Sequence, residues 1–280
     1  MFITHYESLD FDTPLPMNLI FHPEYGDKLV LPHWHPAIEF AYIAKGHPGT
    51  ALLAGQSYEL SEDSFILIDS NLLHSFNTYL NDQNRILTIL LPQDWLTRGF
   101  PADNDYHFKT GKFELKDYPE LRPLLADLKD FSQQTSPVPA ALYRAIGSSY
   151  QLASVLLRDF LETASAKMEK QEIPLIIQQT MIELQLNYGQ EISIGEIATT
   201  YNFSPAYFSK YFKSYVGMAP KIYLNQVRLE AARKALLHSK KMIGTIALES
   251  GFGTEKNFFV MFKKHFHCTP AEFRHLSQKK

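Results

Sequence analysis

The distribution of hydrophobic and polar positions divides the chain into a strand-rich first part and a helical second part. Up to about residue 110, short runs rich in β-branched and aromatic residues alternate with turn signals such as KGHPG and DSN. Five of these runs predict strands, at residues 29–32, 38–44, 50–53, 64–68 and 86–91. Because the runs recur about every ten residues, they predict a β-sandwich or a small barrel.

From residue 118 the apolar positions recur at three- and four-residue spacing, which is typical of amphipathic helices. This pattern predicts two helices within 118–163, joined by the segment TSPVP. Residues 164–173 are polar and have no apolar period, so they are either a linker or the frayed end of a helix. We therefore expect a first domain over 1–163 with its barrel over 1–110, a linker over 164–173, and a helical domain over 174–280.

The helical domain contains an internal repeat. At an offset of 49 residues, IGEIATTYNF (194–203) aligns with IGTIALESGF (243–252). After one inserted residue, an offset of 50 aligns Phe208, Phe212 and Lys213 with Phe258, Phe262 and Lys263. Each copy has a short helix containing a small alanine, then a turn, then a helix with aromatic residues four apart. This plan predicts two helix-turn-helix motifs, at 193–215 and 242–266.

The first copy contains the residue types that begin and end helices. Ser193 and Glu196 have the spacing of a capping box, and Ser204 with Pro205 can start the second helix. Gly217 can end that helix. Between the copies, APKIYLNQVRLEAARKALLHS predicts one long amphipathic helix. A rigid helix there would hold two DNA-reading helices about 34 Å apart, which is one turn of B-form DNA.

The net charge of −3 conceals an uneven distribution along the chain. Residues 172–280 carry +6 and residues 1–171 carry −9, which indicates a polyanion-binding module joined to an acidic module. The single cysteine, Cys268, excludes an internal disulfide and a cysteine-type zinc site. The sequence has no apolar run of membrane-spanning length and no secretory signal, so we expect a cytoplasmic protein without a membrane partner.

The run from about residue 174 to 277 resembles the DNA-binding domain of the AraC/XylS family of bacterial transcription regulators. The resemblance rests on ISIGEIATTYNFSPAYFSKYFKSYVGMAPKIYLNQVRLEAARKAL and IGTIALESGFGTEKNFFVMFKKHFHCTPAEFR. It implies a seven-helix domain that places two recognition helices in adjacent major-groove segments of double-stranded DNA. Carried over position by position, it implies DNA contacts by Ala206, Tyr207, Ser209, Lys210, Lys213, Glu255, Lys256, Phe259, Val260 and Lys263.

The second recognition helix departs from the family pattern at two positions. The family usually has a small or polar residue where this chain has Phe259, and often arginine where it has Val260. Two apolar side chains can touch thymine methyl groups but donate no hydrogen bonds. Either this helix reads DNA mainly through shape and phosphate contacts, or Phe259 packs on a neighbouring protein surface.

A histidine cluster stands out in the strand-rich part. His33, His35, Glu39 and Gly46 have the spacing H-x-H-x3-E-x6-G. On one strand the first three would share a face, because strand side chains alternate. The spacing is similar to the first cupin motif, and residues 1–110 resemble the cupin-type sensor domain of AraC-like regulators. The later histidine of cupins corresponds to His74, although Glu62–Asp63 replaces the usual Gly–Asp pair and the usual proline before the histidine is absent.

Three interpretations of His33, His35, Glu39 and His74 are open. The first is a divalent metal site, since imidazoles and a carboxylate suit zinc, nickel, iron or manganese. The second is a metal-free pocket that hydrogen-bonds a polar effector such as a sugar. The third is a structural role at the ends of strands. A metal-dependent cupin enzyme would use the same residues but would not need two helix-turn-helix motifs, so we do not expect an enzyme.

These patterns together predict an α+β protein of two domains: a cupin-like β-barrel with flanking helices, and an all-α domain with two helix-turn-helix motifs. We expect a transcription regulator that binds double-stranded DNA and a small polar effector. The resemblance implies an activator, because activation is the commoner behaviour in this family. It should require no cofactor, with a divalent metal in the pocket as the open alternative. The apolar stripes over 118–163 favour a homodimer, because helices at this place often form a dimer contact in the resembling family.

Overall fold

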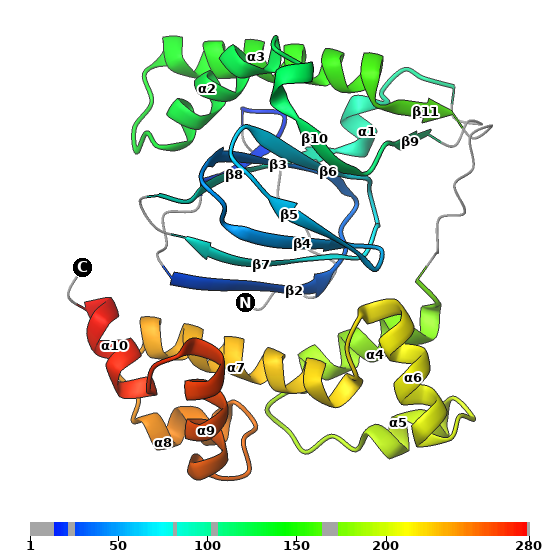
Figure 1. Ribbon diagram of the computed structural model, residues 1–280, viewed down its shortest axis with the longest axis vertical. Helices are drawn as coiled ribbons and strands as arrows, with labels where there is room; N and C mark the ends of the chain where they lie inside the picture. Colours follow the sequence, from blue (N-terminus) through cyan, green and yellow to red (C-terminus); the bar gives the residue numbers. More distant parts are fainter. Residues whose placement is uncertain (1–13, 22–25, 81–82, 102–105, 164–172, 279–280) are drawn as a thin grey trace. The chain divides into compact units, whose positions relative to one another are not determined.

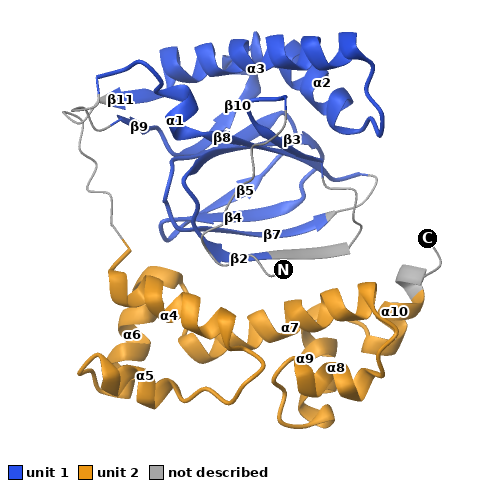
Figure 2. Cartoon of the chain, turned by 180° about the vertical axis from the view of Figure 1, so that it is seen from behind, with its two compact units in different colours: residues 1–172 blue, residues 173–280 orange. Residues whose placement is uncertain are grey.

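The structure is a computed structural model that divides into two compact units, residues 1–172 and 173–280 (Figure 2). Each unit has a hydrophobic core of its own. Most of the predicted linker, residues 164–172, lies outside the described residues. The residues that the structure describes are 14–21, 26–80, 83–101, 106–163 and 173–278.

The first unit is built on two antiparallel sheets that face one another (Figure 1). The five-stranded sheet has the order β1 (Asn18–Phe21), β8 (Arg85–Pro92), β3 (Ala37–Lys45), β6 (Ser64–Ile68) and β10 (Gly111–Glu114). The four-stranded sheet has the order β2 (Gly26–His33), β7 (His74–Leu80), β4 (Gly49–Leu53) and β5 (Gln56–Leu60). A small third sheet pairs β9 (Tyr106–Phe108) with β11 (Leu161–Thr163). Among the described residues no strand pairing joins the two large sheets, so the fold is a cupin-like sandwich and not a closed barrel.

The five-stranded sheet is buried on both faces. On one face Ala41 and Ile43 pack against the four-stranded sheet, and on the other Phe40 packs beneath two helices. These helices are α2 (Leu121–Ser132) and α3 (Pro139–Asp159), which confirms the helix pair predicted within 118–163. Two short helices complete the unit, α1 (Gln93–Leu96) and η1 (Leu115–Asp117). Since Glu39 has the same strand parity as Ala41 and Ile43, its side chain lies between the sheets.

The second unit consists of seven helices within residues 173–278. They are α4 (Leu175–Leu186), α5 (Ile194–Thr200), α6 (Pro205–Val216), α7 (Pro220–His238), α8 (Ile243–Glu249), α9 (Glu255–Phe266) and α10 (Pro270–Gln278). The pairs α5–α6 and α8–α9 are the two predicted helix-turn-helix motifs, and α7 is the long helix between them. None of the described helices is both long and apolar enough to cross a membrane.

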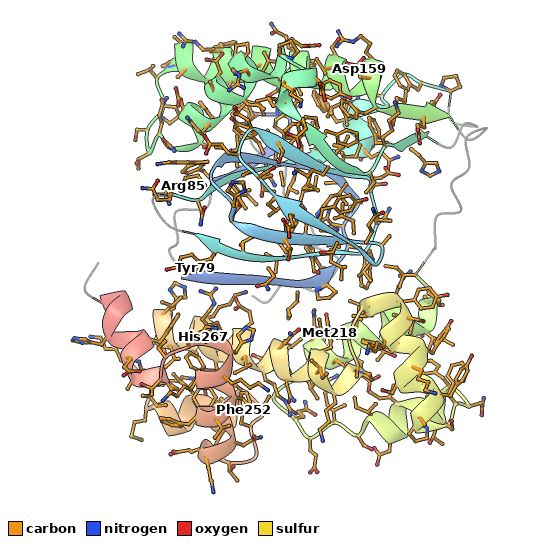
Figure 3. The ribbon with its side chains drawn as sticks, viewed as in Figure 1. Tyr79, Arg85, Asp159, Met218, Phe252 and His267 are labelled. Atoms are coloured by element: carbon orange, nitrogen blue, oxygen red, sulfur yellow. The ribbon has the colours of Figure 1, made fainter. Side chains whose placement is uncertain are left out.

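The second helices of the two motifs begin with equivalent capping hydrogen bonds. The Ser204 hydroxyl accepts a hydrogen bond from the backbone N–H of Tyr207 at 3.3 Å, and the Thr254 hydroxyl accepts one from Asn257 at 3.2 Å. These caps satisfy backbone donors at the start of each recognition helix. The second motif packs on Phe258 and Phe262, together with Phe252 from the turn, which Figure 3 labels.

Candidate effector pocket and DNA-binding helices

The four residues of the histidine cluster come together at one end of the β-sandwich. His33 is the last residue of β2 and pairs in register with His74, the first residue of β7. Glu39 lies on β3 in the opposite sheet. The expectation that both early histidines occupy one strand is wrong, because the chain bends at Pro36 and His35 lies between β2 and β3. The cluster therefore spans the two sheets and is not one face of one strand.

Backbone carbonyl groups orient all three imidazole rings. The Nδ1 atoms of His33, His35 and His74 lie 2.9, 3.0 and 2.8 Å from the carbonyl oxygens of Leu31, Ala37 and Leu72. A carbonyl oxygen only accepts, so each Nδ1 carries the proton and donates it.

The Nε2 atoms of His35 and His74 converge on the carboxylate of Glu39. Its Oε2 lies 3.2 Å from Nε2 of His35 and 3.0 Å from Nε2 of His74. The rings of His33 and His74 lie 4.1 Å apart between centroids. The four side chains offer one ligand atom each, and all four atoms lie within 4.8 Å of one another, so the group has the composition and spacing to hold a metal ion.

Burial and mutual contacts shift the ionisation of the cluster. Burial is the main cause that lowers the pKa of His33 well below its usual value, and the nearby His74 lowers it further. Burial by itself raises the pKa of Glu39. Hydrogen bonds from His35 and His74 outweigh it and hold that pKa well below its usual value. The cluster therefore contains a carboxylate anion at Glu39 and a neutral imidazole at His33. The other rings enclose the His33 ring, although part of the residue is exposed at the surface.

The first recognition helix presents a polar outer face. Ala206, Tyr207, Lys210 and Lys213 are exposed on α6, and Ser209 is half-buried at the edge of this face. Because Phe208 and Phe212 are fully buried on the opposite side, the outer face is fixed in direction. An exposed helix with two lysines on its outer face has the shape and charge that major-groove binding requires.

The second recognition helix has a smaller outer face. Lys256, Val260 and Lys263 are exposed on α9, but Phe259 is half-buried and packs against the core of its own motif. Glu255 is exposed, yet its carboxylate lies over Gly244 of α8, since a Cβ built on that glycine would be 1.7 Å from Oε1. Neither Phe259 nor Glu255 extends fully outward from α9.

Arg228 is a functional candidate that no pattern in the sequence indicated. On α7, the guanidinium of Arg228 donates hydrogen bonds to the carbonyl oxygens of Tyr188 and Gln190, both at 2.8 Å. A Cβ on Gly251, in the turn of the second motif, would lie 2.7 Å from Arg228 Nε and 2.1 Å from Tyr188 O. Arg228 thus ties the segment before the first motif to the turn of the second. We call this contact the Arg228 clamp.

A second polar pair lies where β6 ends. Asp69 is buried and directly follows Ile68, which pairs in register with Glu39. Its Oδ2 lies 3.2 Å from Nδ1 of His107 on β9. Because β9 pairs with β11, the Asp69–His107 pair connects the strand beside the cluster to the last strand of the first unit.

Two family models match this chain and together cover most of it. A helix-turn-helix domain model matches residues 197–275, and the model of the AraC-like ligand binding domain matches residues 21–146. A β-sandwich with a buried polar cluster, joined to a helical unit with two helix-turn-helix motifs, defines a DNA-binding regulator with a ligand-binding domain. The chain belongs to the AraC family of transcription regulators.

Curated relatives and solved structures carry related names. The chain is 25% identical over 277 residues to the HTH-type transcriptional activator RhaS of Pectobacterium carotovorum, and this match covers 95% of each protein. It is 29% identical over 126 residues to the lactose operon transcription activator of Staphylococcus xylosus, covering 45% of this chain and 44% of that protein. An AraC-type transcriptional regulator structure from Chromobacterium violaceum is 28% identical, covers 36% of this chain and 91% of its own, and has a TM-score of 0.34. ToxT from Vibrio cholerae is 13% identical, covers 92% of this chain and 96% of its own, and has a TM-score of 0.47.

Proposed function

We propose that this regulator activates transcription in response to a small polar metabolite, a sugar, that binds between the two sheets of the first unit. One observation carries the proposal: a buried, polar, preformed cluster occupies the ligand-binding domain of a chain that also has two helix-turn-helix motifs. The names of the relatives, an activator and a lactose operon activator, support activation and a sugar.

The proposal assigns roles to the residues of both units. In the first unit His33, His35, Glu39 and His74 form the polar wall that the effector contacts. The same four residues are also suited to a divalent metal ion. In the second unit the proposed DNA contacts are Ala206, Tyr207, Ser209, Lys210, Lys213, Lys256, Val260 and Lys263, with Glu255 and Phe259 at the margin.

A homodimer is part of the proposal, and α3 is its proposed contact. Tyr143 and Tyr150 are 73% and 58% exposed on this helix, so both can offer aromatic side chains to a partner. Light scattering of the full chain at micromolar concentration should give twice the chain mass, and a monomer would contradict the dimer. A bacterial regulator of this kind acts in the cytoplasm, where the DNA lies, so a cytoplasmic location is part of the proposal.

The test joins ligand binding to DNA binding in the full chain. A duplex selected from a random pool supplies the DNA site, and a thermal-shift screen of sugars supplies the ligand. A sugar that raises the melting temperature should also change the affinity for the selected duplex. A sugar that binds without any effect on DNA affinity would sink the sensing proposal, and failure to select any duplex would sink the DNA-binding assignment.

A further inference from the structure

The outer face of α9 has an apolar side chain at its centre. Each residue of an α-helix is turned by about 100° from the one before it, so positions can be placed around the helix axis. Val260 lies about 160° around the axis from Phe258 and from Phe262, which are both fully buried. Val260 therefore points directly away from the core of its motif, and 61% of the residue is exposed.

Polar and charged side chains surround Val260 on this face. Each of them lies three or four residues from Val260 and is exposed: Lys256, Asn257, Lys263 and Lys264. The three lysines can bind DNA phosphates, and such contacts are independent of base sequence. The central position is therefore the one on which recognition of a particular base depends.

Phe259 and Glu255 do not compete for this position. Phe259 packs against the core of its motif, and the carboxylate of Glu255 lies over Gly244 of α8. Val260 is thus the apolar side chain that α9 offers to a major groove.

The same central place in the first motif has the opposite chemistry. The offset of 50 residues that aligns Phe208 with Phe258 also aligns Lys210 with Val260. The lysine is a cation and a hydrogen-bond donor, whereas the valine is apolar and donates nothing. The two recognition helices therefore do not present the same chemical group to DNA at this place.

We infer that Val260 recognises the methyl group of a thymine in the half of the DNA site that α9 binds. When such a helix lies in a major groove, its central outward side chain faces the base edges. Thymine is the base that carries a methyl group there, and apolar side chains distinguish it by contact with this methyl group. This inference rests on the proposed function, because it requires that α9 binds DNA.

The experiment removes the methyl group from the DNA and the side chain from the protein in turn. Each thymine of the duplex selected by the full chain is replaced singly by uracil, which differs from thymine only in lacking the methyl group. At one thymine the parent should lose affinity about fourfold, which is the effect of burying roughly one CH₂-sized group. Val260→Ala should bind the original duplex more weakly, and uracil at that thymine should then have no further effect.

Two variants are matched controls, measured by anisotropy of the labelled duplex. Val138→Ala removes another exposed valine, from the first unit, and should respond to uracil as the parent does. Lys210→Ala changes the other recognition helix, so it should bind more weakly and keep the uracil effect. Circular dichroism checks that each variant is folded.

The outcomes separate this inference from the proposed function. If every uracil affects the parent and Val260→Ala equally, or if the selected duplex binds and contains no thymine, the methyl contact is overturned. In both cases the parent still binds its duplex, so the DNA-binding assignment stands. If the parent selects no duplex, the DNA-binding assignment fails and the inference fails with it.

Discussion

Left-handed backbone positions recur at the same points of the two helix-turn-helix copies. Asn202 and Gly251 have φ values of 59° and 81° after the first helix of each copy, and Gly217 and His267 have 81° and 58° after the second. His267 is labelled in Figure 3. The left-handed conformation costs a residue with a side chain about 1–2 kcal/mol. Glycine avoids this cost but loses more backbone entropy on folding, so a change to glycine recovers only part of it. His267→Gly should therefore raise the free energy of unfolding by roughly 0.5–1 kcal/mol. Urea denaturation of the full chain checks this, and a lowered midpoint would contradict it.

Gly251 is constrained by space as well as by conformation. An added Cβ would lie 2.1 Å from the carbonyl oxygen of Tyr188, which is backbone and cannot move cheaply. Gly251→Ala should lower the free energy of unfolding by about 1–3 kcal/mol through left-handed strain, and the clash adds to this. Gly253→Ala is the matched control, because nothing lies within 4 Å of a Cβ there. Equal melting temperatures for the two variants would refute the argument.

Lys210 has a testable electrostatic role on the outer face of α6. Each lysine that neutralises a DNA phosphate releases counterions, so its removal weakens binding and makes binding less salt-dependent. Lys210→Ala should reduce affinity for the selected duplex and lower the slope of log affinity against log salt by about 1. Lys116→Ala, an exposed lysine of the first unit, is the control. An unchanged slope would remove Lys210 from the proposed contacts.

At the scale of elements, the Arg228 clamp brings the segment before α5 and the turn before α9 to one side chain of α7. We expect this contact to limit the movement of the two recognition helices, α6 and α9. If the clamp sets their separation, the parent should accept one spacing between the two halves of its DNA site. Arg228→Ala should select duplexes with a broader range of spacings and lower the unfolding free energy by about 2 kcal/mol, through loss of two charged hydrogen bonds. Arg233→Ala is the matched control, because Arg233 pairs with Glu230 inside α7. Identical spacing preferences for Arg228→Ala and the parent would show that the clamp only stabilises the fold.

The elements with strong burial could be predicted from the sequence, and those without it could not. β3 and β6 are rich in apolar residues because their sheet is buried on both faces, although Glu39 interrupts β3. In α6, Phe208 and Phe212 have helical spacing. The edge strand β5 has mostly exposed residues, so its apolar pattern is too weak to mark it.

The candidate site could be predicted only in part. Spacing brought out all four members of the histidine cluster, but the parity rule failed because Pro36 bends the chain between His33 and Glu39. The sequence does not indicate which backbone carbonyl oxygen accepts a hydrogen bond from a side chain, since every residue has a carbonyl group. This applies to the three carbonyl oxygens that orient the imidazoles and to the two that bind Arg228. The arrangement of backbone groups, and not the choice of side chains, was therefore the missing information.

At the scale of the whole molecule, the proposed sensing requires a route by which a bound effector changes DNA binding by the second unit. The Asp69–His107 pair is suited to be part of it. Asp69 follows the residue that pairs with Glu39, and His107 lies on β9, whose partner β11 ends at Thr163, the last described residue before the second unit. The coupling between the effector site and the DNA-binding site is a free energy. Weakening the Asp69–His107 contact should reduce this coupling without removing either binding site.

Asp69→Asn tests this route, because it removes the charge and keeps the shape. The variant should bind the sugar found in the thermal screen as the parent does, while the sugar-induced change in DNA affinity falls by about fivefold, or ~1 kcal/mol. His107→Gln should have the same effect, and the double variant should add little to either one, as expected for two residues that act through one contact. Fluorescence anisotropy of a labelled duplex, with and without sugar, measures all four proteins. Additive losses, or an unchanged response in Asp69→Asn, would place the coupling elsewhere in the first unit.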